Sequence, residues 1–317
     1  MNFVRFIILL LASFSLTGCA SLVSSYLQSA DSFSYDSIGS PEEIAELGFT
    51  KREHCSAKED RCTYYFIGEP LTSRRLQYQT EISSARSTTA VELSATRDNL
   101  PVYAPSTIVL MHGFRASKEF MINTALYFRF LGFNVIVPDL LGHGDSAGAK
   151  TFGVIDSYVI NEIIAKEHSP QLNLYLLGNS MGAVAATRIA SMRDDVHGLI
   201  LQAPMLNFDE AVLRYSSSNY PFLAGLIGED AILNGASSAL AEVNLTASDT
   251  NILPMLASLS VPTLILTSSA DEVSPYAAFA QLTSEQLSVK NLPNRNHPSM
   301  AIVDNDSSEI ILNWLEQ

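Results

Sequence analysis

From residue 107 onward, short apolar runs alternate with longer segments of helical periodicity. Residues 107–111, 172–177 and 263–267 are apolar or β-branched almost throughout, which predicts strands that are buried on both faces. Strands that alternate with helices predict a parallel sheet covered by helices on both sides, an α/β fold. Further strands are expected at 133–137, 196–201 and 287–292, and helices at 118–131, 152–167, 183–192 and 302–315.

The alternation is interrupted between Pro204 and Pro262, where the sequence is mostly helical and rich in apolar residues. Because parallel sheets bind ligands beyond the carboxyl ends of their strands, we interpret residues 205–260 as a helical cap over that edge. Earlier in the chain, residues 62–67, 76–82 and 90–96 have β-rich patterns and are expected at the edge of the sheet.

Length and charge limit the possible functions. The 317 residues can form one large α/β domain, and 47% hydrophobic with 16% charged residues is typical of an ordered globular protein. The formal net charge of −14 would repel phosphate backbones, and the sequence has no basic stripe to offset it. Nucleic-acid binding is therefore not expected.

The N-terminus has the pattern of an export signal. Arg5 precedes the apolar run 6–12, which is too short to span a bilayer, and small residues follow it. The end of this segment, Leu16-Thr17-Gly18-Cys19, resembles the lipobox of bacterial lipoproteins. The resemblance implies a signal peptide over residues 1–18 and acylation of Cys19, which would anchor the chain to a membrane of the cell envelope. The residue after Cys19 is Ala20 and not Asp, which in a Gram-negative cell would direct the lipoprotein to the outer membrane. An ordinary signal peptide with a chance cysteine is the alternative.

The residues after Cys19 are rich in serine, and we interpret 19–40 as a tether. Order is expected to begin at Ser40, where Pro41 at the first helical position and Glu43 in a capping box predict a short helix. The two remaining cysteines, Cys55 and Cys62, are expected to pair in an exported protein. Metal binding is the weaker alternative, because two nearby thiols without a second ligand cluster rarely form a site.

The candidate nucleophile is Ser180 in Gly178-Asn179-Ser180-Met181-Gly182. This G-x-S-x-G motif follows an expected strand and opens an expected helix, which is the context that makes the motif informative. A sharp strand-to-helix turn needs neighbours without a Cβ, and it holds the serine at the N-terminus of a helix. A plain Gly-Ser turn is the alternative.

A serine needs a base, and the base needs a carboxylate. Among six histidines, His297 is the best candidate, because it lies in the loop after the last expected strand. Asp271 follows the strand at 263–267 and is the favoured acid, while Asp209 after the preceding strand is its competitor. Two backbone N–H groups would hold an oxyanion, those of Met181 and of Phe114 in the loop His112-Gly113-Phe114. His112 is expected to orient that loop.

These motifs resemble the α/β-hydrolase superfamily, and in particular its monoacylglycerol-lipase and lysophospholipase-like branch, which is also grouped with serine aminopeptidases. The resemblance covers residues 106–317 and includes the loop 139–146. It implies an α/β-hydrolase domain over residues 41–317 with a mostly parallel sheet. Asn179 and Ala183 depart from the branch, which commonly has His and Gly there. His112 and His143 could bind a metal in principle, but no ligand cluster completes a site, and no metal or cofactor is expected.

The leading functional prediction is a lipid-anchored serine hydrolase that cleaves carboxylic esters of small acyl substrates, such as a monoacylglycerol or lysophospholipid, through a Ser-His-Asp triad and an acyl-enzyme. Peptide or amide hydrolysis is the alternative, and it would need a buried acid in the cap. A non-catalytic surface-binding lipoprotein is a third possibility, which would usually show a broken triad. For the peptide or amide alternative, the candidates for the buried acid are Glu210, Glu229 and Asp230.

Overall fold

The computed structural model describes residues 18–33, 39–99, 103, 106–282 and 284–317. The apolar runs form the buried strands of an eight-stranded sheet in the order β1-β2-β6-β5-β7-β8-β9-β10. The strands from β6 to β10 in this order are parallel, whereas β2 pairs antiparallel with β6 and β1 pairs antiparallel with β2. The mostly parallel sheet is the α/β fold expected from the sequence. The strands are β1 (Phe49–Ser56), β2 (Arg61–Gly68), β5 (Ser106–Met111), β6 (Phe133–Pro138), β7 (Asn173–Asn179), β8 (Val196–Gln202), β9 (Thr263–Thr267) and β10 (Leu287–Asn291).

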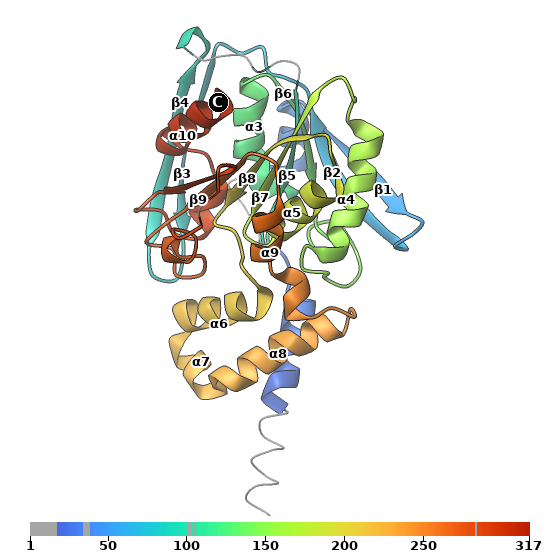
Figure 1. The fold of residues 1–317 in the computed structure, drawn as a ribbon, viewed down its shortest axis with the longest axis vertical. Coiled ribbons are helices and arrows are strands. Elements are labelled where there is room, and N and C mark those ends of the chain that lie inside the picture. Colours follow the sequence, from blue (N-terminus) through green and yellow to red (C-terminus); the bar gives the residue numbers. More distant parts are fainter. Residues whose placement is uncertain (1–17, 34–38, 100–102, 104–105, 283) are drawn as a thin grey trace, which may run out of the picture.

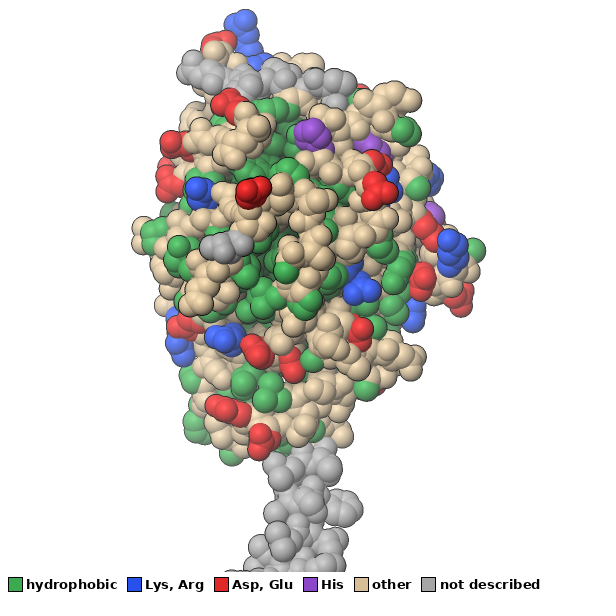
Figure 2. Space-filling model, viewed as in Figure 1, with side chains coloured by type: hydrophobic (Ala, Val, Ile, Leu, Met, Phe, Trp, Pro, Cys, Tyr) green, Lys and Arg blue, Asp and Glu red, His purple; other side chains and the backbone are tan. Residues whose placement is uncertain are grey.

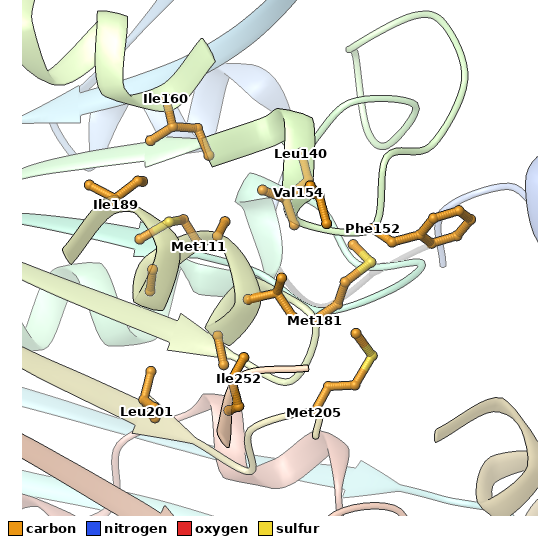
Figure 3. Packing of buried hydrophobic residues seen from close by; sticks show 14 of the residues in the cluster. Met111, Leu140, Phe152, Val154, Ile160, Met181, Ile189, Leu201, Met205 and Ile252 are labelled. Atoms are coloured by element: carbon orange, nitrogen blue, oxygen red, sulfur yellow. The ribbon is translucent and has the colours of Figure 1, made fainter. Parts of the chain in front are cut away.

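Helices cover both faces of this sheet (Figure 1). One apolar cluster joins the sheet to α3 (Ile122–Phe130) and α10 (Asn305–Leu315), and a second joins it to α4 (Val154–Glu167) and α5 (Gly182–Met192). Figure 3 shows part of the second cluster, where side chains from β5, β8, α4 and α5 pack into one layer. Short 3-10 turns occur at η1 (Arg97–Asn99), η2 (Lys118–Met121), η4 (Tyr276–Ala278) and η5 (Pro298–Ala301).

A helical segment lies between β8 and β9; its first three helices form the lobe at the bottom of Figure 1, and its last helix lies beside α5. Its buried residues belong to the same apolar cluster as α4 and α5, so this cap shares one continuous core with the sheet. Its elements are α6 (Phe208–Asn219), α7 (Pro221–Ile227), α8 (Glu229–Ala241), η3 (Ala247–Thr250) and α9 (Leu253–Ser258).

The prediction that residues 76–82 and 90–96 join the edge of the main sheet is wrong. They form β3 (Arg75–Ser83) and β4 (Thr88–Thr96), which pair only with each other as a separate antiparallel hairpin. Every second residue of β4 is buried, and Val91 and Leu93 pack into the cluster that contains α3 and α10. The edge beside β6 is taken instead by β2 and by β1, which is mostly exposed and therefore lacks an apolar pattern.

The N-terminal region differs from the expected tether, because residues 18–29 form a helix. Leu27 is buried in the core cluster, and Ser24 and Gln28 hydrogen-bond to Glu242 and to the Ala239 carbonyl at the end of α8. Serine is tolerated in this helix because most of its serines face solvent. No helix in the described ranges is long and apolar enough to cross a membrane. Most of the predicted signal peptide, residues 1–17, lies outside the described residues.

The short helix expected from Ser40 is present as α2 (Pro41–Glu46). Ser40 caps it by accepting a hydrogen bond from the Glu43 N–H, and the Glu43 carboxylate accepts one from the Ser40 N–H. This reciprocal capping box satisfies two N–H groups at the start of the helix.

Candidate active site

Ser180 lies in the sharp turn between β7 and α5, with a left-handed backbone at φ 49°. This conformation is strained for a residue with a side chain. The flanking glycines are required by close backbone contacts. A Cβ on Gly178 would lie 2.5 Å from the Gly182 carbonyl oxygen, and one on Gly182 would collide with the Met111 carbonyl at the end of β5. The sequence therefore folds here into a turn that holds the Ser180 side chain at the carboxyl edge of the sheet.

The structure brings together the three residues expected to form a triad. His297, in the loop between β10 and η5, places its Nε2 2.9 Å from Ser180 Oγ. Its Nδ1 lies 2.7 Å from Asp271 Oδ2, in the loop after β9. Ser180 and Asp271 are buried, whereas the His297 side chain is about one-fifth exposed. This geometry allows the histidine to take a proton from the serine while the carboxylate fixes the orientation of the ring.

Asp271 is held in place by backbone groups of its own loop. Asp271 Oδ1 accepts hydrogen bonds from the backbone N–H groups of Val273 and Ser274, at 2.8 and 2.9 Å. The other carboxylate oxygen of Asp271, Oδ2, is therefore free to accept a hydrogen bond from His297 Nδ1. The competing acid, Asp209, lies in the first turn of α6, where its carboxylate accepts a hydrogen bond from the Glu210 N–H. The geometry therefore selects Asp271 over Asp209 as the partner of His297.

The two N–H groups expected to bind an oxyanion lie on neighbouring loops. Met181 follows Ser180 and precedes α5, and Phe114 follows β5, the strand that pairs with β7. Gly113 permits the loops to approach, since a Cβ there would lie 3.2 Å from Ser180 Cβ. Within the described residues, neither the Met181 nor the Phe114 N–H donates to a protein acceptor. Both are therefore available to a ligand.

His112 holds the Phe114 loop in place. Its Nε2 accepts a hydrogen bond from the Leu140 N–H at 2.9 Å, and its Nδ1 lies 2.8 Å from the Gly113 carbonyl. Burial lowers the pKa of His112 to about 4, so the ring is neutral. His143 packs edge-on against His112, and burial places its pKa well below the usual range.

The metal alternative for these histidines is not supported by the geometry, because His112 Nε2 is already occupied by Leu140. In the described part of the chain, the one cluster with metal-ligand spacing is Glu53, Cys55 and Cys62. Cys55 and Cys62 face each other in the β1–β2 pair and form a disulfide, as expected, so their thiolates are not available to a metal. Cys19 is a free cysteine in the N-terminal helix.

The side chain of Phe114 connects the active-site edge to the cap. It packs against Phe152 and against Phe208, the first residue of α6, with ring centroids 6.4 and 6.1 Å apart. Phe152 and Phe208 are closer to each other, at 4.1 Å, and both are buried. The acids named for amine binding, Glu210, Glu229 and Asp230, are all exposed on the cap. The cap therefore meets this edge with an aromatic surface rather than with a buried carboxylate.

The β3–β4 hairpin contributes residues that the sequence did not indicate. Asn296, beside His297, is buried and donates through Nδ2 to the carbonyls of Ile82 and Ser87, at 3.0 and 3.1 Å. Arg86, at the tip of the hairpin, forms an ion pair with Glu272, beside Asp271. The hairpin thus contacts both loops that carry the partners of Ser180. No short motif signals such contacts, because they join residues about 200 positions apart.

Asn179, which departs from the resembled branch, has a structural role here. Its Nδ2 donates to the Gln202 carbonyl at 3.2 Å, and the same carbonyl accepts the Ser180 N–H at 2.9 Å. Asn179 therefore ties the Ser180 turn to the end of β8.

Comparisons with known proteins agree with this architecture. Residues 104–229 match the family model described as "Serine aminopeptidase, S33". A crystal structure of an esterase from Pyrococcus furiosus has a TM-score of 0.61 at 14% identity, covering 90% of this chain and 97% of that one. A membrane phospholipase A, described as a bacterial virulence factor, has a TM-score of 0.53 at 18% identity over 99% and 98% of the two chains. An esterase from Rhodococcus sp. has a TM-score of 0.51 at 17% identity over 84% and 98%. No curated protein sequence matches the chain.

The strand order, the Gly178–Gly182 turn after β7 and the helical segment between β8 and β9 fit the α/β-hydrolase fold. The family match and the similar solved structures agree with this fold.

Proposed function

We propose that the protein is a serine hydrolase that cleaves carboxylic esters. The observation that carries this proposal is the continuous contact from Ser180 Oγ to His297 to Asp271, at 2.9 and 2.7 Å. A broken triad would have favoured a non-catalytic binding protein, and these contacts argue against that alternative.

In the proposed reaction, His297 Nε2 takes the proton of Ser180 as its Oγ attacks the ester carbonyl carbon. The N–H groups of Met181 and Phe114 hold the resulting oxyanion, and each such donor lowers the barrier by about 3 kcal/mol. The protonated His297 then gives its proton to the leaving alcohol, which leaves an acyl-enzyme. Water, deprotonated by His297, attacks this ester, and the carboxylic acid and free Ser180 are released. No step requires a metal or a cofactor.

The substrate proposed is an acyl ester with an apolar chain, such as a monoacylglycerol or lysophospholipid. The aromatic contact among Phe114, Phe152 and Phe208 supports an apolar bound group beside the nucleophile. We also propose that the chain is exported and anchored through an acylated Cys19 to the cell envelope, in the outer membrane if the cell is Gram-negative. The lipobox-like residues 16–19 support this part of the proposal.

The second candidate is amide or peptide hydrolysis, which the description of the matching family model favours. A set of acyl esters of increasing length and a set of aminoacyl amides would separate the two activities. We expect higher kcat/KM for esters, and none above background for Ser180→Ala. Higher kcat/KM for the amides would overturn the ester assignment.

Labelling with an organophosphonate probe tests the nucleophile itself. We expect labelling of the wild-type chain and none of Ser180→Ala. Equal labelling of both chains would contradict the assignment of Ser180, and absence of labelling in the wild type would contradict the catalytic proposal.

A further inference from the structure

The turn that contains Phe114 has an arginine where the backbone favours glycine. Residues 113–116 form this turn, which the Ala116 N–H closes by donating to the Gly113 carbonyl at 3.1 Å. Arg115, the third residue of the turn, has a left-handed backbone at φ 59°. Glycine or asparagine is typical of that position, and a long side chain persists there only where its surroundings hold it. The contacts of Arg115 must therefore stabilise the turn.

The N-terminal segment, residues 26–33, supplies these contacts. Arg115 Nε donates to the Asp31 carbonyl at 2.9 Å, and Nη1 donates to the Tyr26 hydroxyl at 2.8 Å. The guanidinium lies 4.2 Å from the centre of the Phe33 ring, a cation–π contact. The Arg115 carbonyl accepts a hydrogen bond from the Phe33 N–H at 2.7 Å. The segment therefore holds both the backbone and the side chain of Arg115.

The N-terminal segment is itself fixed to the rest of the fold. The Gln28 side chain accepts a hydrogen bond from the Lys150 N–H at 3.1 Å, and Lys150 Nζ donates to the Gln28 carbonyl at 2.8 Å. Ser32 Oγ accepts from the Gly144 N–H at 2.9 Å and donates to the Ala116 carbonyl at 3.3 Å. The segment is therefore a packed part of the domain that can hold the turn in one place.

The charges around Arg115 favour a cation at this position. Asp31 is the one charged side chain of residues 18–33, and residues 205–260 contain six acidic side chains and one basic side chain. Figure 2 shows acidic side chains on the cap lobe at the bottom of the molecule. Burial raises the pKa of Tyr215, on α6, to about 12, and the nearby charge of Arg115 opposes this rise. Arg115 therefore lies between the N-terminal segment and the cap.

We propose that Arg115 is a positioning residue, through which the N-terminal segment fixes the Phe114 N–H for the oxyanion. Phe114 directly precedes Arg115 in the turn, while His112 holds the other side of the loop through Leu140. An oxyanion donor acts mainly in the transition state, so its displacement lowers kcat more than it changes KM. This proposal rests on the proposed ester hydrolysis.

The substitution Arg115→Gly is the main test. It relieves the left-handed backbone and removes both side-chain hydrogen bonds, so the chain should still fold. The matched control is Asn244→Gly, at an exposed residue of the cap that also has φ 59°. With a dissolved acetate ester, we expect kcat of Arg115→Gly to fall by about 10- to 100-fold with KM little changed, and kcat of Asn244→Gly to stay as in the wild type. An unchanged kcat in Arg115→Gly would overturn the proposal.

A boronic acid inhibitor tests the oxyanion donors directly. Ser180 Oγ adds to the boron atom while His297 takes its proton, and the tetrahedral anion mimics the transition state. We expect the inhibition constant of Arg115→Gly to rise by the same factor by which its kcat falls. A lower kcat with an unchanged inhibition constant would overturn the proposal, because the loss would then come from a smaller folded fraction or from another step.

Tyr26→Phe tests whether Arg115 acts through the N-terminal segment. This change removes only the hydroxyl that accepts from Arg115, and kcat should fall by about threefold. In the Arg115→Gly background, the same change should have no further effect, because the donor is already absent. An equal fall in both backgrounds would overturn the link between the segment and Arg115.

Amide hydrogen exchange separates this proposal from the proposed function. The Ala116 N–H, which closes the turn, should exchange faster in Arg115→Gly than in the wild type, and no faster in Asn244→Gly. Equal exchange in the wild type and in Arg115→Gly would overturn the positioning role. If the wild type hydrolysed no ester, the proposed function would fail, while the exchange result would still decide whether the N-terminal segment holds the turn through Arg115.

Discussion

The β3–β4 hairpin and the cap both approach the edge of the sheet that carries Ser180, but they contact it through different chemistry. The hairpin makes directional hydrogen bonds, above all from Asn296 to its backbone carbonyls. The cap makes an aromatic contact, through Phe208 on Phe114 and Phe152. Directional bonds fix the orientation of a loop, whereas aromatic packing supplies binding energy with less angular control. We infer that the hairpin positions His297 and that the cap determines what reaches Ser180.

The largest expected effect concerns the aromatic contact that packs the cap against the sheet domain. Phe208→Ala removes a buried ring from the aromatic contact and should lower the free energy of unfolding by about 3–4 kcal/mol. Urea denaturation measures the loss. The matched control is Phe222→Ala, the same change on the same cap at an exposed site, which should alter stability by less than about 0.5 kcal/mol. Equal effects of the two substitutions would show that the cap is not held by Phe208.

Acid should lower the stability of the fold through His112, which lies in the loop that carries Phe114. His112 is buried with its pKa lowered to about 4, whereas in the unfolded chain it takes up a proton below its ordinary pKa of 6.5. The unfolded state then binds more protons, so stability falls as the pH drops from 6.5 to about 4, by roughly 3 kcal/mol for this group. His143 acts in the same direction. The β3–β4 hairpin, residues 75–96, contains no histidine.

Thermal unfolding measured across this pH range tests the assignment. His112→Gln keeps an acceptor for the Leu140 N–H, and its stability should depend less on pH than that of the wild type. His197→Gln, the same change at an exposed position, is the control. An unaltered slope in His112→Gln would refute the role of His112.

The hairpin side is tested at Asn296. Asn296→Ala leaves the carbonyls of Ile82 and Ser87 without this donor, and should cost about 2 kcal/mol of stability. Because His297 is the next residue, we also expect kcat to fall by about 10- to 100-fold with KM little changed. Steady-state kinetics on a dissolved ester measures this.

Asn305→Ala is the control for this prediction. Asn305 accepts a hydrogen bond from the Ser94 N–H on β4. Its substitution therefore removes a contact that holds the hairpin, but at a site away from His297. It should lower stability slightly and leave kcat within twofold. A similar loss of kcat in both variants would mean that the hairpin acts through general stability and not through Asn296.

The same contrast explains which features could be predicted from the sequence. The α/β fold followed from local patterns, because buried parallel strands are apolar throughout, and Ser180 followed from a turn that only its two glycines permit. His297 and Asp271 followed from their places after strands. The separate hairpin was not predicted, since alternating burial in β4 does not say which surface the strand covers. The helix at 18–29 was not predicted either, because its stability comes from packing on α8 and not from its serine-rich composition.

The smallest expected effect concerns Arg86, through which the β3–β4 hairpin contacts the cap. Arg86 at the tip of the hairpin pairs with Glu272 and also reaches the Ser217 carbonyl of the cap, at 3.4 Å. Both charged side chains are about half exposed, so Arg86→Met should change stability by less than about 1 kcal/mol, and the difference should shrink in high salt. Lys51→Met, which breaks a surface pair with Asp145 of similar exposure, is the control. Both variants should keep kcat within twofold on a dissolved ester, because Asp271 is held by the backbone of its own loop. A tenfold fall in kcat confined to Arg86→Met would instead show that the hairpin positions the Asp271 loop through this ion pair. The contact of the hairpin with Asn296 would then not be its main influence on the catalytic residues.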